Sequence, residues 1–322
     1  MKKPLSYQEF KDLAASLPSR ESFGPDSKNP FIAFELASLE PHFAPWLKDL
    51  PCPVIGIGEG PLSDACDVVL ADTKKLAKLH KNISCAPLAS MILVQHLRAS
   101  ETLSLQDALT AESFAYAAIQ TGPEFQTWLE AYQGGPLQIS GQSVIEISIK
   151  NQTLSLLLNQ PENRNAIGTT MRDALCEALD MALMDEAITK VMLTGNGSTF
   201  STGGAIEEFG EVSDPATAHW VRSLRLPAWR LARLKDRIEI HVNGAAIGAG
   251  AEMAAFADMV TASPKAWFQL PELKYGLIPG AGGTASIPRR IGRQKTAYMA
   301  LSMEKIRAET ALEWGLIDAI ID

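Results

Sequence analysis

The chain has 322 residues, of which 46% are hydrophobic and 20% are charged, and its formal net charge at pH 7 is −8. A chain of this length and apolar content can bury one large core or two moderate ones. The acidic excess argues against binding to nucleic acid and against a polybasic membrane anchor. No apolar run reaches the roughly 20 residues that span a membrane, and the N-terminus lacks the apolar stretch of a secretory signal, so we expect a cytoplasmic protein.

Residues 1–135 have the pattern of an α/β segment, with apolar runs that predict strands and 3.6-residue periodicity that predicts helices. The expected strands are 31–36, 53–57 and 67–71, and the expected helices are 5–16, 39–50, 73–81, 86–99, 104–120 and 123–132. Ser104 is a suitable N-cap for the helix that follows it. The polar stretch Gln133–Pro136 marks the clearest boundary in the chain.

Beyond this boundary, strands and helices alternate along the chain. A hairpin is expected around Asn151 and Gln152. The expected strands are 144–149, 153–158, 190–194, 238–242 and 259–262, and the expected helices are 168–185, 251–257, 286–292, 296–301 and 308–315. Such alternation is typical of an α/β fold.

Two glycine-rich segments, 244–252 and 271–284, carry most of the functional information, because each places a glutamate beside a turn of small residues. Small residues let the backbone approach a ligand closely, and a carboxyl group beside it can move protons on that ligand. A third segment, 191–206, runs from a buried strand into a glycine-rich turn, where free backbone N–H groups suit an anion or a developing oxyanion. The two glutamates are Glu252 and Glu272.

Other readings of these residues are structural. Glu252 could be a solvated helix residue, and Glu272 could cap a helix or pair with Lys274 or Arg289. The turn at 280–283 lacks the Lys-Ser or Lys-Thr of a nucleotide-binding loop. The cysteines form no C-x-x-C pair and no histidine has zinc-finger spacing, so no metal site is expected. The arginines between 222 and 237 predict a solvated helix face, with one or two of them available for a phosphate.

The combined pattern from about residue 142 to 322 resembles the crotonase (enoyl-CoA hydratase/isomerase) superfamily. The segments that carry the resemblance are Pro161–Ala166, the turn at 202–206, the helix start at 244–252 and the stretch 271–284. It implies a spiral of ββα units, with backbone amides at Gly204 and Ala249 that form an oxyanion hole and with Glu252 and Glu272 as catalytic residues. The substrate-binding positions that it implies are Arg164, Ala166, Thr202, Gly203, Ala205, Ile206 and Gly248.

The resemblance also implies an acyl-CoA thioester as substrate, with coenzyme A as part of that substrate and no further cofactor. Hydration of a 2,3-double bond needs one group that takes a proton from water and one that delivers a proton to carbon. The presence of both glutamates favours a hydratase, with Glu272 as the donor to carbon and Glu252 as the group that activates water. The alternatives are an enoyl-CoA isomerase, another CoA-enolate reaction, or a non-catalytic acyl-CoA-binding subunit.

Three features depart from the family pattern. Ala205 stands where the family often has Asp, and Ala249 replaces a common Gly. The sequence given ends at Asp322, where typical members continue through helices that cover the CoA site and pack in a trimer or hexamer.

Because the helices that follow this point in typical members are not in the sequence given, residues 1–135 can be interpreted in three ways. Residues 86–132 could stand in for those helices, since 103–126 resembles them. Residues 1–135 could be a degenerate repeat, because 52–71 echoes 238–262, or an unrelated helical domain. A structure in which 104–132 lies away from the core would contradict the first reading.

Overall fold

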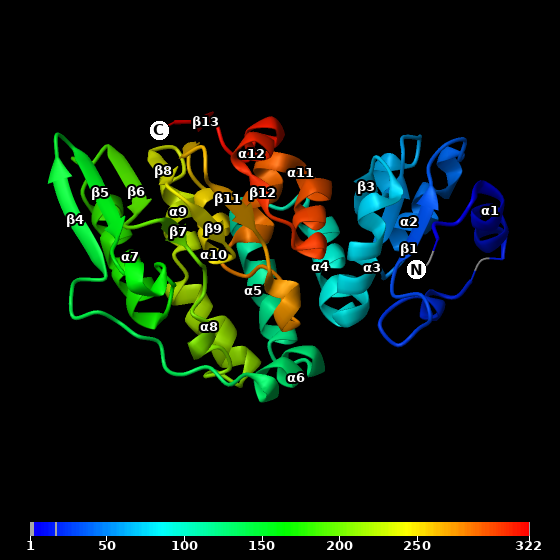
Figure 1. The fold of residues 1–322 in the computed structure, drawn as a ribbon, viewed down its shortest axis with the longest axis horizontal. Helices are drawn as coiled ribbons and strands as arrows, with labels where there is room; N and C mark the ends of the chain where they lie inside the picture. The colour runs from blue at the N-terminus through cyan, green and yellow to red at the C-terminus, as the bar shows by residue number, and fades with distance from the viewer. Residues whose placement is uncertain (1–2, 17, 322) are drawn as a thin grey trace.

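The computed structural model describes residues 3–16 and 18–321 of an elongated α/β molecule with three sheets (Figure 1). The N-terminal sheet is parallel, in the order β1-β2-β3, and lies at one end of the molecule, whereas a six-stranded sheet lies at the opposite end. The N-terminal strands and their flanking helices are β1 (Ile32–Glu35), β2 (Val54–Ile57), β3 (Val68–Leu70), α1 (Tyr7–Ala15) and α2 (Ala44–Asp49).

The N-terminal sheet is buried on both faces, which explains the continuous apolar runs of its strands. Side chains alternate across a strand, so Ile32 and Phe34 pack into a cluster with α1 and α2. Phe31, Ala33 and Ile55 face the other way and join the main core of the molecule. The N-terminal segment therefore shares a core with the rest of the chain.

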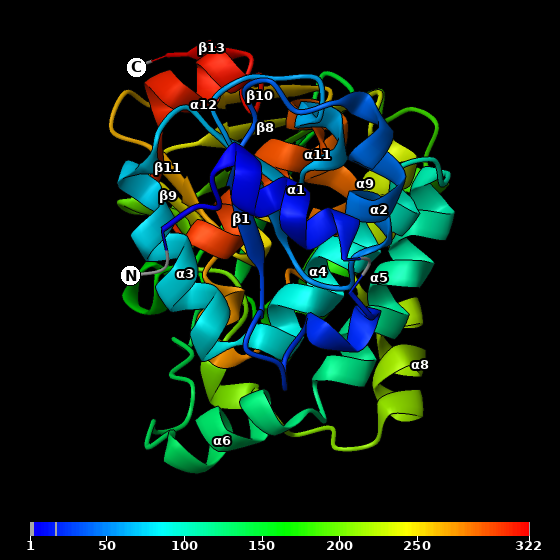
Figure 2. The ribbon, with the colours of Figure 1, turned by 90° about the vertical axis from the view of Figure 1, so that its right-hand side faces the viewer.

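Four helices follow the sheet and lie between it and the C-terminal half: α3 (Leu76–Cys85), α4 (Pro87–Ser100), α5 (Leu105–Ile119) and α6 (Pro123–Ala131). Ser104 caps α5 as the sequence predicts, with its hydroxyl 3.1 Å from the amide nitrogen of Asp107. Helices α4 and α5 pack against α11 (Gly283–Ser302), and α5 also packs against α8 (Pro215–Arg225). In the view from the N-terminal end, α8 lies beside α5 and α6 lies below them (Figure 2).

A buried ionic junction ties the two halves together at Asp67. Its carboxylate accepts hydrogen bonds from Arg98 of α4 and Arg293 of α11, and its Oδ2 lies 2.8 Å from the amide nitrogen of Val54. A buried carboxylate needs this many donors, because an unpaired charge in the interior is costly. The junction fixes β3 against α4 and α11.

The six-stranded sheet has the order β13-β10-β8-β6-β5-β4. Its strands β4 and β5 form the expected antiparallel hairpin, and the other neighbours are parallel. The strands are β4 (Ile145–Lys150), β5 (Thr153–Leu158), β6 (Lys190–Gly195), β8 (Ile238–Val242), β10 (Met259–Ala262) and β13 (Ala319–Ile320).

A second layer of four short strands follows the order β12-β11-β9-β7. Three of the long strands, β6, β8 and β10, each lead into a short strand and then into a helix, as in β8, β9, α10, so the C-terminal half is a spiral of ββα units, as predicted. The short strands are β7 (Thr199–Ser201), β9 (Ala245–Ile247), β11 (Trp267–Gln269) and β12 (Ile306–Arg307). The remaining helices are α7 (Thr169–Met184), α9 (Ala228–Leu234), α10 (Ala249–Ala254) and α12 (Ala308–Trp314).

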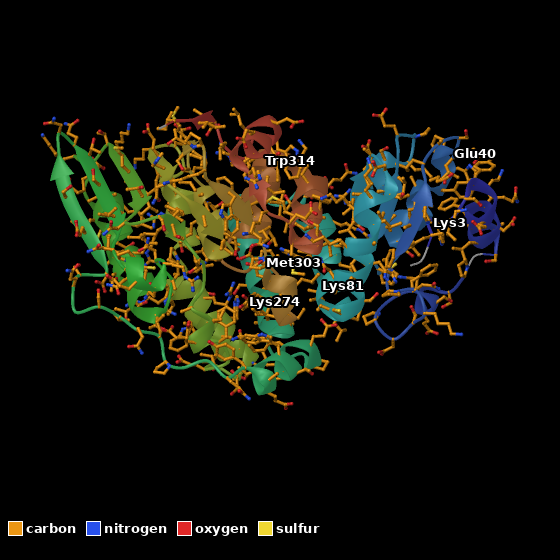
Figure 3. All side chains as sticks on the ribbon, in the orientation of Figure 1. Lys3, Glu40, Lys81, Lys274, Met303 and Trp314 are labelled. Carbon is orange, nitrogen blue, oxygen red and sulfur yellow. The ribbon has the colours of Figure 1, made fainter. Side chains whose placement is uncertain are left out.

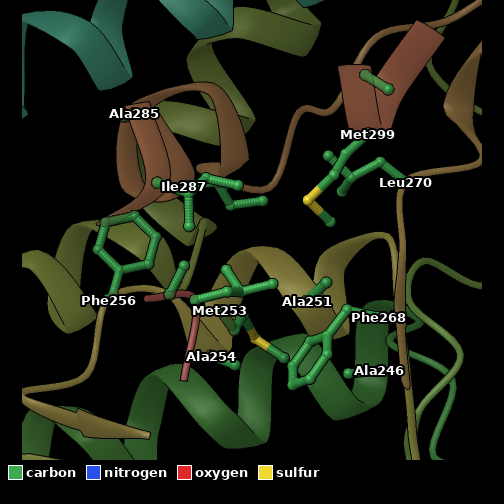
Figure 4. Packing of buried hydrophobic residues seen from close by; sticks show 14 of the residues in the cluster. Ala246, Ala251, Met253, Ala254, Phe256, Phe268, Leu270, Ala285, Ile287 and Met299 are labelled. Carbon is green, nitrogen blue, oxygen red and sulfur yellow. The ribbon is translucent and has the colours of Figure 1, made fainter. Parts of the chain in front are cut away.

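Helix α10 is short, and apolar packing holds it in place. Figure 4 shows Met253 and Phe256 among the buried side chains of this region, together with Ile287 of α11 and Phe268 of β11. Close packing of this kind leaves few alternative positions for a backbone segment. The first turn of α10, which carries Ala249 and Glu252, is therefore rigidly placed.

The short 3₁₀ helix η7 (Glu272–Tyr275) joins β11 to the turn before α11. It contacts α3 and α6 of the N-terminal half. Figure 3 labels Lys274 of η7 and Lys81 of α3, where these two elements meet. The predicted site residue Glu272 thus lies on an element in contact with helices from both halves.

Candidate active site

A cavity of about 270 Å³ opens between α5, α8, α10 and η7. Its lining includes Gly204, Ala205, Ala249, Glu252 and Glu272, which come from separate predicted segments of the sequence. The spiral of ββα units brings these segments together, because the parallel short strands β7, β9 and β11 end at the same side of the second layer. The cavity is the candidate active site.

The turn after β7 presents the amide of Gly204. An isolated bridge pairs Gly204 with Ile167, and its hydrogen bonds use the carbonyl of Gly203 and the amide of Ala205. The Gly204 N–H stays outside this pairing. A serine hydroxyl supports the turn, because Ser201 Oγ accepts from the Gly203 amide at 3.1 Å.

The second turn lies directly against the first. Gly203 has φ +83°, and a Cβ there would be 2.5 Å from the carbonyl oxygen of Ile247 and 3.0 Å from the amide nitrogen of Ala249. Only glycine fits this position. Ala249 is the first residue of α10, so its amide has no acceptor within that helix. The amides of Gly204 and Ala249 therefore lie close together at the cavity wall.

Glu252 is buried and anchored by the backbone. The amides of Ala281 and Gly283 donate to its Oε2, at 2.6 Å and 2.8 Å. Burial raises the pKa of Glu252 well above its usual value, repulsion from Glu272 and Glu112 adds to the rise, and the two amides oppose it. The interpretation of Glu252 as a solvated helix residue is therefore wrong.

Glu272 has a different environment from Glu252. Its Oε2 is buried and accepts no hydrogen bond from residues 3–16 or 18–321. Burial raises its pKa to about 8, and the charge of Glu112 adds to the rise. The alternative of a surface ion pair is wrong, since Arg289 donates instead to the carbonyls of Ala285 and Leu103.

The predicted substrate-binding residues border the two turns. The carbonyl of Arg164 accepts from the amide of Thr202 at 3.1 Å, so the two segments run side by side. Arg164 itself has a left-handed backbone (φ 60°) and an exposed side chain. The remaining predicted positions, which lie in or beside the turns, are Ala166, Gly203, Ile206 and Gly248.

Part of the cavity wall was not predicted from the sequence. Tyr116 of α5 and Arg222 of α8 line it, and the guanidinium carbon of Arg222 lies 4.2 Å from the centre of the Tyr116 ring. Arg222 also donates to the carbonyl of Gly280 and lies 3.8 Å from the carboxylate of Glu112. Its side chain is only 15% exposed.

The prediction of a solvated arginine face is wrong for three of its members. Besides Arg222, which is half-buried in the cavity wall, Arg230 pairs with Asp180 at 2.9 Å. Arg237 donates to the carbonyls of Ile188 and Ala182. Tertiary contacts therefore use cations that periodicity alone assigned to solvent.

Two kinds of feature are absent from the described ranges. Within them, no group of three or more His, Cys, Asp or Glu side chains is arranged to hold a metal ion. Over the same ranges, no helix is both long and apolar enough to cross a membrane.

Comparison with known proteins agrees with this fold. A family model described as enoyl-CoA hydratase/isomerase matches residues 148–322. The chain belongs to the enoyl-CoA hydratase/isomerase family, the crotonase superfamily.

Curated relatives match a little over half of the chain. It is 35% identical over 179 residues to 2,3-dehydroadipyl-CoA hydratase of Escherichia coli K12, a match that covers 55% of this chain and 69% of that one. It is 35% identical over 173 residues to a mitochondrial enoyl-CoA hydratase of Pongo abelii, a match that covers 53% of this chain and 59% of that one. It is 34% identical over 178 residues to 1,2-epoxyphenylacetyl-CoA isomerase of E. coli K12, covering 54% and 68%. The chain thus spans between three fifths and about two thirds of these relatives.

Solved structures give the same result. An enoyl-CoA hydratase from Thermoplasma volcanium GSS1 is similar, with a TM-score of 0.50 and 31% identity over 56% of this chain and 73% of that one. An enoyl-CoA hydratase/isomerase from Mycobacterium paratuberculosis has a TM-score of 0.52 and 25% identity over 56% and 74%. Residues 1–147 lie outside the family match.

Proposed function

We propose that the protein is an enoyl-CoA hydratase, which adds water across the 2,3-double bond of an acyl-CoA thioester. The observation that carries the proposal is the placement of Glu252 and Glu272 in one cavity with Gly204 and Ala249. The names of its relatives support CoA-thioester chemistry, and they include both hydratases and an isomerase. Coenzyme A enters as part of the substrate, and the reaction needs no further cofactor.

In this proposal the thioester oxygen lies between the amides of Gly204 and Ala249. Negative charge grows on that oxygen as the thioester becomes enolate-like, so preorganised donors stabilise the transition state more than the ground state. The close contact of the two turns supports this role. The methyl group of Ala249 does not remove the donor, because the donor is the backbone N–H.

The proton roles follow from the unequal environments of the two carboxyl groups. Two amides oppose the rise in the pKa of Glu252 that burial causes, and in this proposal Glu252 is the group that takes a proton from water. Glu272 has an unpartnered buried oxygen and a pKa raised to about 8, so it holds the proton that passes to the α-carbon. A buried pair of this kind titrates as a unit.

Isomerisation is the alternative that one observation favours. Glu252 Oε2 is bound by two amides, and a glutamate that only anchored the turn would leave Glu272 as the single acid–base group of an isomerase. Replacement of Glu252 by Gln distinguishes the two reactions, since an isomerase would keep most of its activity. A non-catalytic binding subunit would bind CoA esters without any turnover.

Helices α4–α6 take the place of the family's C-terminal helices in this proposal. The packing of α4 and α5 against α11 and of α5 against α8, with Tyr116 in the cavity wall, supports it. A circular permutation or fused duplication would produce such an arrangement. The trimer or hexamer that the resemblance implies stays a prediction, which sedimentation velocity tests.

The test of the proposed function is loss of the thioester-enone absorbance when crotonyl-CoA or a longer enoyl-CoA is mixed with the wild-type protein. Turnover of any chain length supports hydration. Binding of CoA esters without loss of absorbance would move the assignment to another enolate reaction or to a binding role.

A further inference from the structure

The turn before α11 is held by two carboxylates that bind alternate amides. Ala281 and Gly283 donate to Glu252, as described above. Gly282 donates to Oε1 of Glu112 at 2.7 Å, and Thr284 donates to Oε2 of Glu112 at 2.9 Å. The Thr284 hydroxyl donates the third hydrogen bond to the Glu112 carboxylate, to its Oε2 at 2.6 Å. The four successive amides are thus divided between the two acids.

This division replaces the usual cap of a helix. The first N–H groups of a helix lack acceptors within it, and Gly282, the N-cap of α11, has no side chain to supply one. Gly282 has φ +102°, a conformation that favours glycine. The turn therefore depends on both carboxylates for its shape.

Glu112 comes from α5, outside the family match, and is fully buried. On the same face of α5, one turn later, lies Tyr116. A methyl group at Gly280 would overlap the Tyr116 ring, so the ring lies directly on the start of the turn. Helix α5 thus contacts the turn through two side chains, of which Glu112 makes the hydrogen bonds.

We propose that Glu112 is a positioning residue: it fixes the turn at 281–284, and that turn orients the Glu252 carboxylate toward the cavity. The active site is then completed by a helix outside the part of the chain that matches the family. The inference rests on the proposed function for its reaction, whereas the hydrogen bonds stand independently of the reaction.

A carboxylate is needed at this position because three donors point at it. The side-chain amide of Gln would accept at one atom and present N–H groups at the other, opposite an N–H of the turn. A buried N–H group that faces another N–H group and has no acceptor is costly, so the backbone of the turn shifts to avoid that contact. A displacement of about 1 Å at a reacting group can cost roughly 100-fold in rate.

The charged and titratable groups around Glu112 come from each element that packs near it. Arg222 approaches it from α8, and His96 of α4 reaches it through the Thr284 hydroxyl, 2.8 Å from His96 Nε2. Glu252 and Glu272 face it from α10 and η7. Glu112 raises the pKa of both, so removal of its charge lowers the pKa of Glu272.

The experiment compares Glu112→Gln with Glu124→Gln in the full-length chain. Glu124 is a matched control, because it also accepts backbone amides, those of Leu88 and Ala89, but it caps α4 and not the turn. We expect Glu112→Gln to lower kcat for enoyl-CoA hydration by about 100-fold with little change in KM. The alkaline limb of its pH profile should move to lower pH, a change that a merely structural role would not produce. Glu124→Gln should have the wild-type kcat and the same alkaline limb of the pH profile as the wild type.

A second measurement does not depend on activity. Amide hydrogen exchange of a peptide covering 280–286 should be faster in Glu112→Gln than in the wild type, and unchanged in Glu124→Gln. If Glu112→Gln does not fold, Thr284→Val removes only the hydroxyl donor and should lower kcat by a smaller factor at constant KM. If the wild type hydrates no enoyl-CoA, the proposed function fails, and exchange at 280–286 alone decides the role of Glu112. The inference would be overturned if Glu112→Gln had the wild-type kcat, the wild-type pH profile and the wild-type rate of amide hydrogen exchange at 280–286.

Discussion

Two backbone amides donate to Oε2 of Glu252, whereas Oε2 of Glu272 accepts no hydrogen bond within the described part of the chain. Both carboxyl groups line the same cavity. Hydrogen bonds to a carboxylate favour its ionised form, and burial without them favours the neutral form. The two carboxyl groups therefore differ in the partners that hold them, and the predictions below follow from this difference.

The first prediction concerns the proton donor. Glu272→Gln keeps the shape of the side chain and removes its acidic proton, so hydration should fall by roughly 100- to 10,000-fold. The decrease of the enone absorbance with time gives the rate of hydration. Calorimetry with a saturated acyl-CoA should show that the variant binds this ligand as tightly as the wild type does. Near wild-type turnover in this variant would exclude Glu272 as the donor.

The second prediction concerns water activation. Glu252→Gln should also lower hydration by roughly 100- to 10,000-fold, because Gln cannot take a proton from water. The same variant should retain the exchange of α-protons of a saturated acyl-CoA with deuterated solvent, which needs only Glu272. Loss of both activities would show that Glu252 serves the enolate step as well.

The third prediction concerns pH. Because Glu272 has a pKa of about 8 and donates in its protonated form, kcat/KM for hydration should be high below this pH and fall as the pH rises through it. Rates measured from about pH 6 to about pH 10 define the limb. A rate that instead increases across this range would reverse the assigned protonation state.

The fourth prediction concerns the contact between the two turns. A methyl group at Gly203 would meet Ile247 O and Ala249 N, so Gly203→Ala should displace an oxyanion amide and lower kcat by about 100- to 1,000-fold. Gly292→Ala is the control, because Gly292 also has a positive φ of +80° but a Cβ there meets nothing within 4 Å. Equal activity losses in the two variants would point to backbone strain and not to the oxyanion hole.

The fifth prediction concerns the CoA phosphates. Arg164 is exposed beside Thr202, and a guanidinium binds phosphate through charge-assisted hydrogen bonds. Arg164→Ala should raise KM for an enoyl-CoA and leave KM for the corresponding enoyl-pantetheine thioester unchanged, since the latter lacks phosphates. An equal rise for both substrates would place Arg164 elsewhere in binding.

The sequence predicted those parts of the site that depend on local pattern. The glycine-rich turns, the cap at Ser104 and the hairpin at 144–158 follow from short-range rules, and the structure has all three. Glu252 and Glu272 were identified because each stands beside a turn of small residues. The substrate-binding roles of residues such as Arg164 stay predictions.

The sequence could not predict which residues of α5 reach the site. The bond from Gly282 to Glu112 joins residues 170 positions apart, and no local rule reports such a contact. One signal was present: Leu105, Ala108, Leu109 and Glu112 follow the i, i+3, i+4, i+7 spacing of a buried helix face, so an acid occupies an apolar stripe. A charged residue in such a stripe is rarely buried unless it is paired.

The measurement that tests the central claim most directly is the mass of the product formed from crotonyl-CoA in water enriched in ¹⁸O. If Glu252 activates water and Glu272 delivers a proton, the wild-type protein should form a 3-hydroxyacyl-CoA that carries one solvent oxygen. Glu252→Gln and Glu272→Gln should each form it far more slowly. Consumption or isomerisation of an enoyl-CoA with no solvent oxygen in the product would contradict the hydratase assignment.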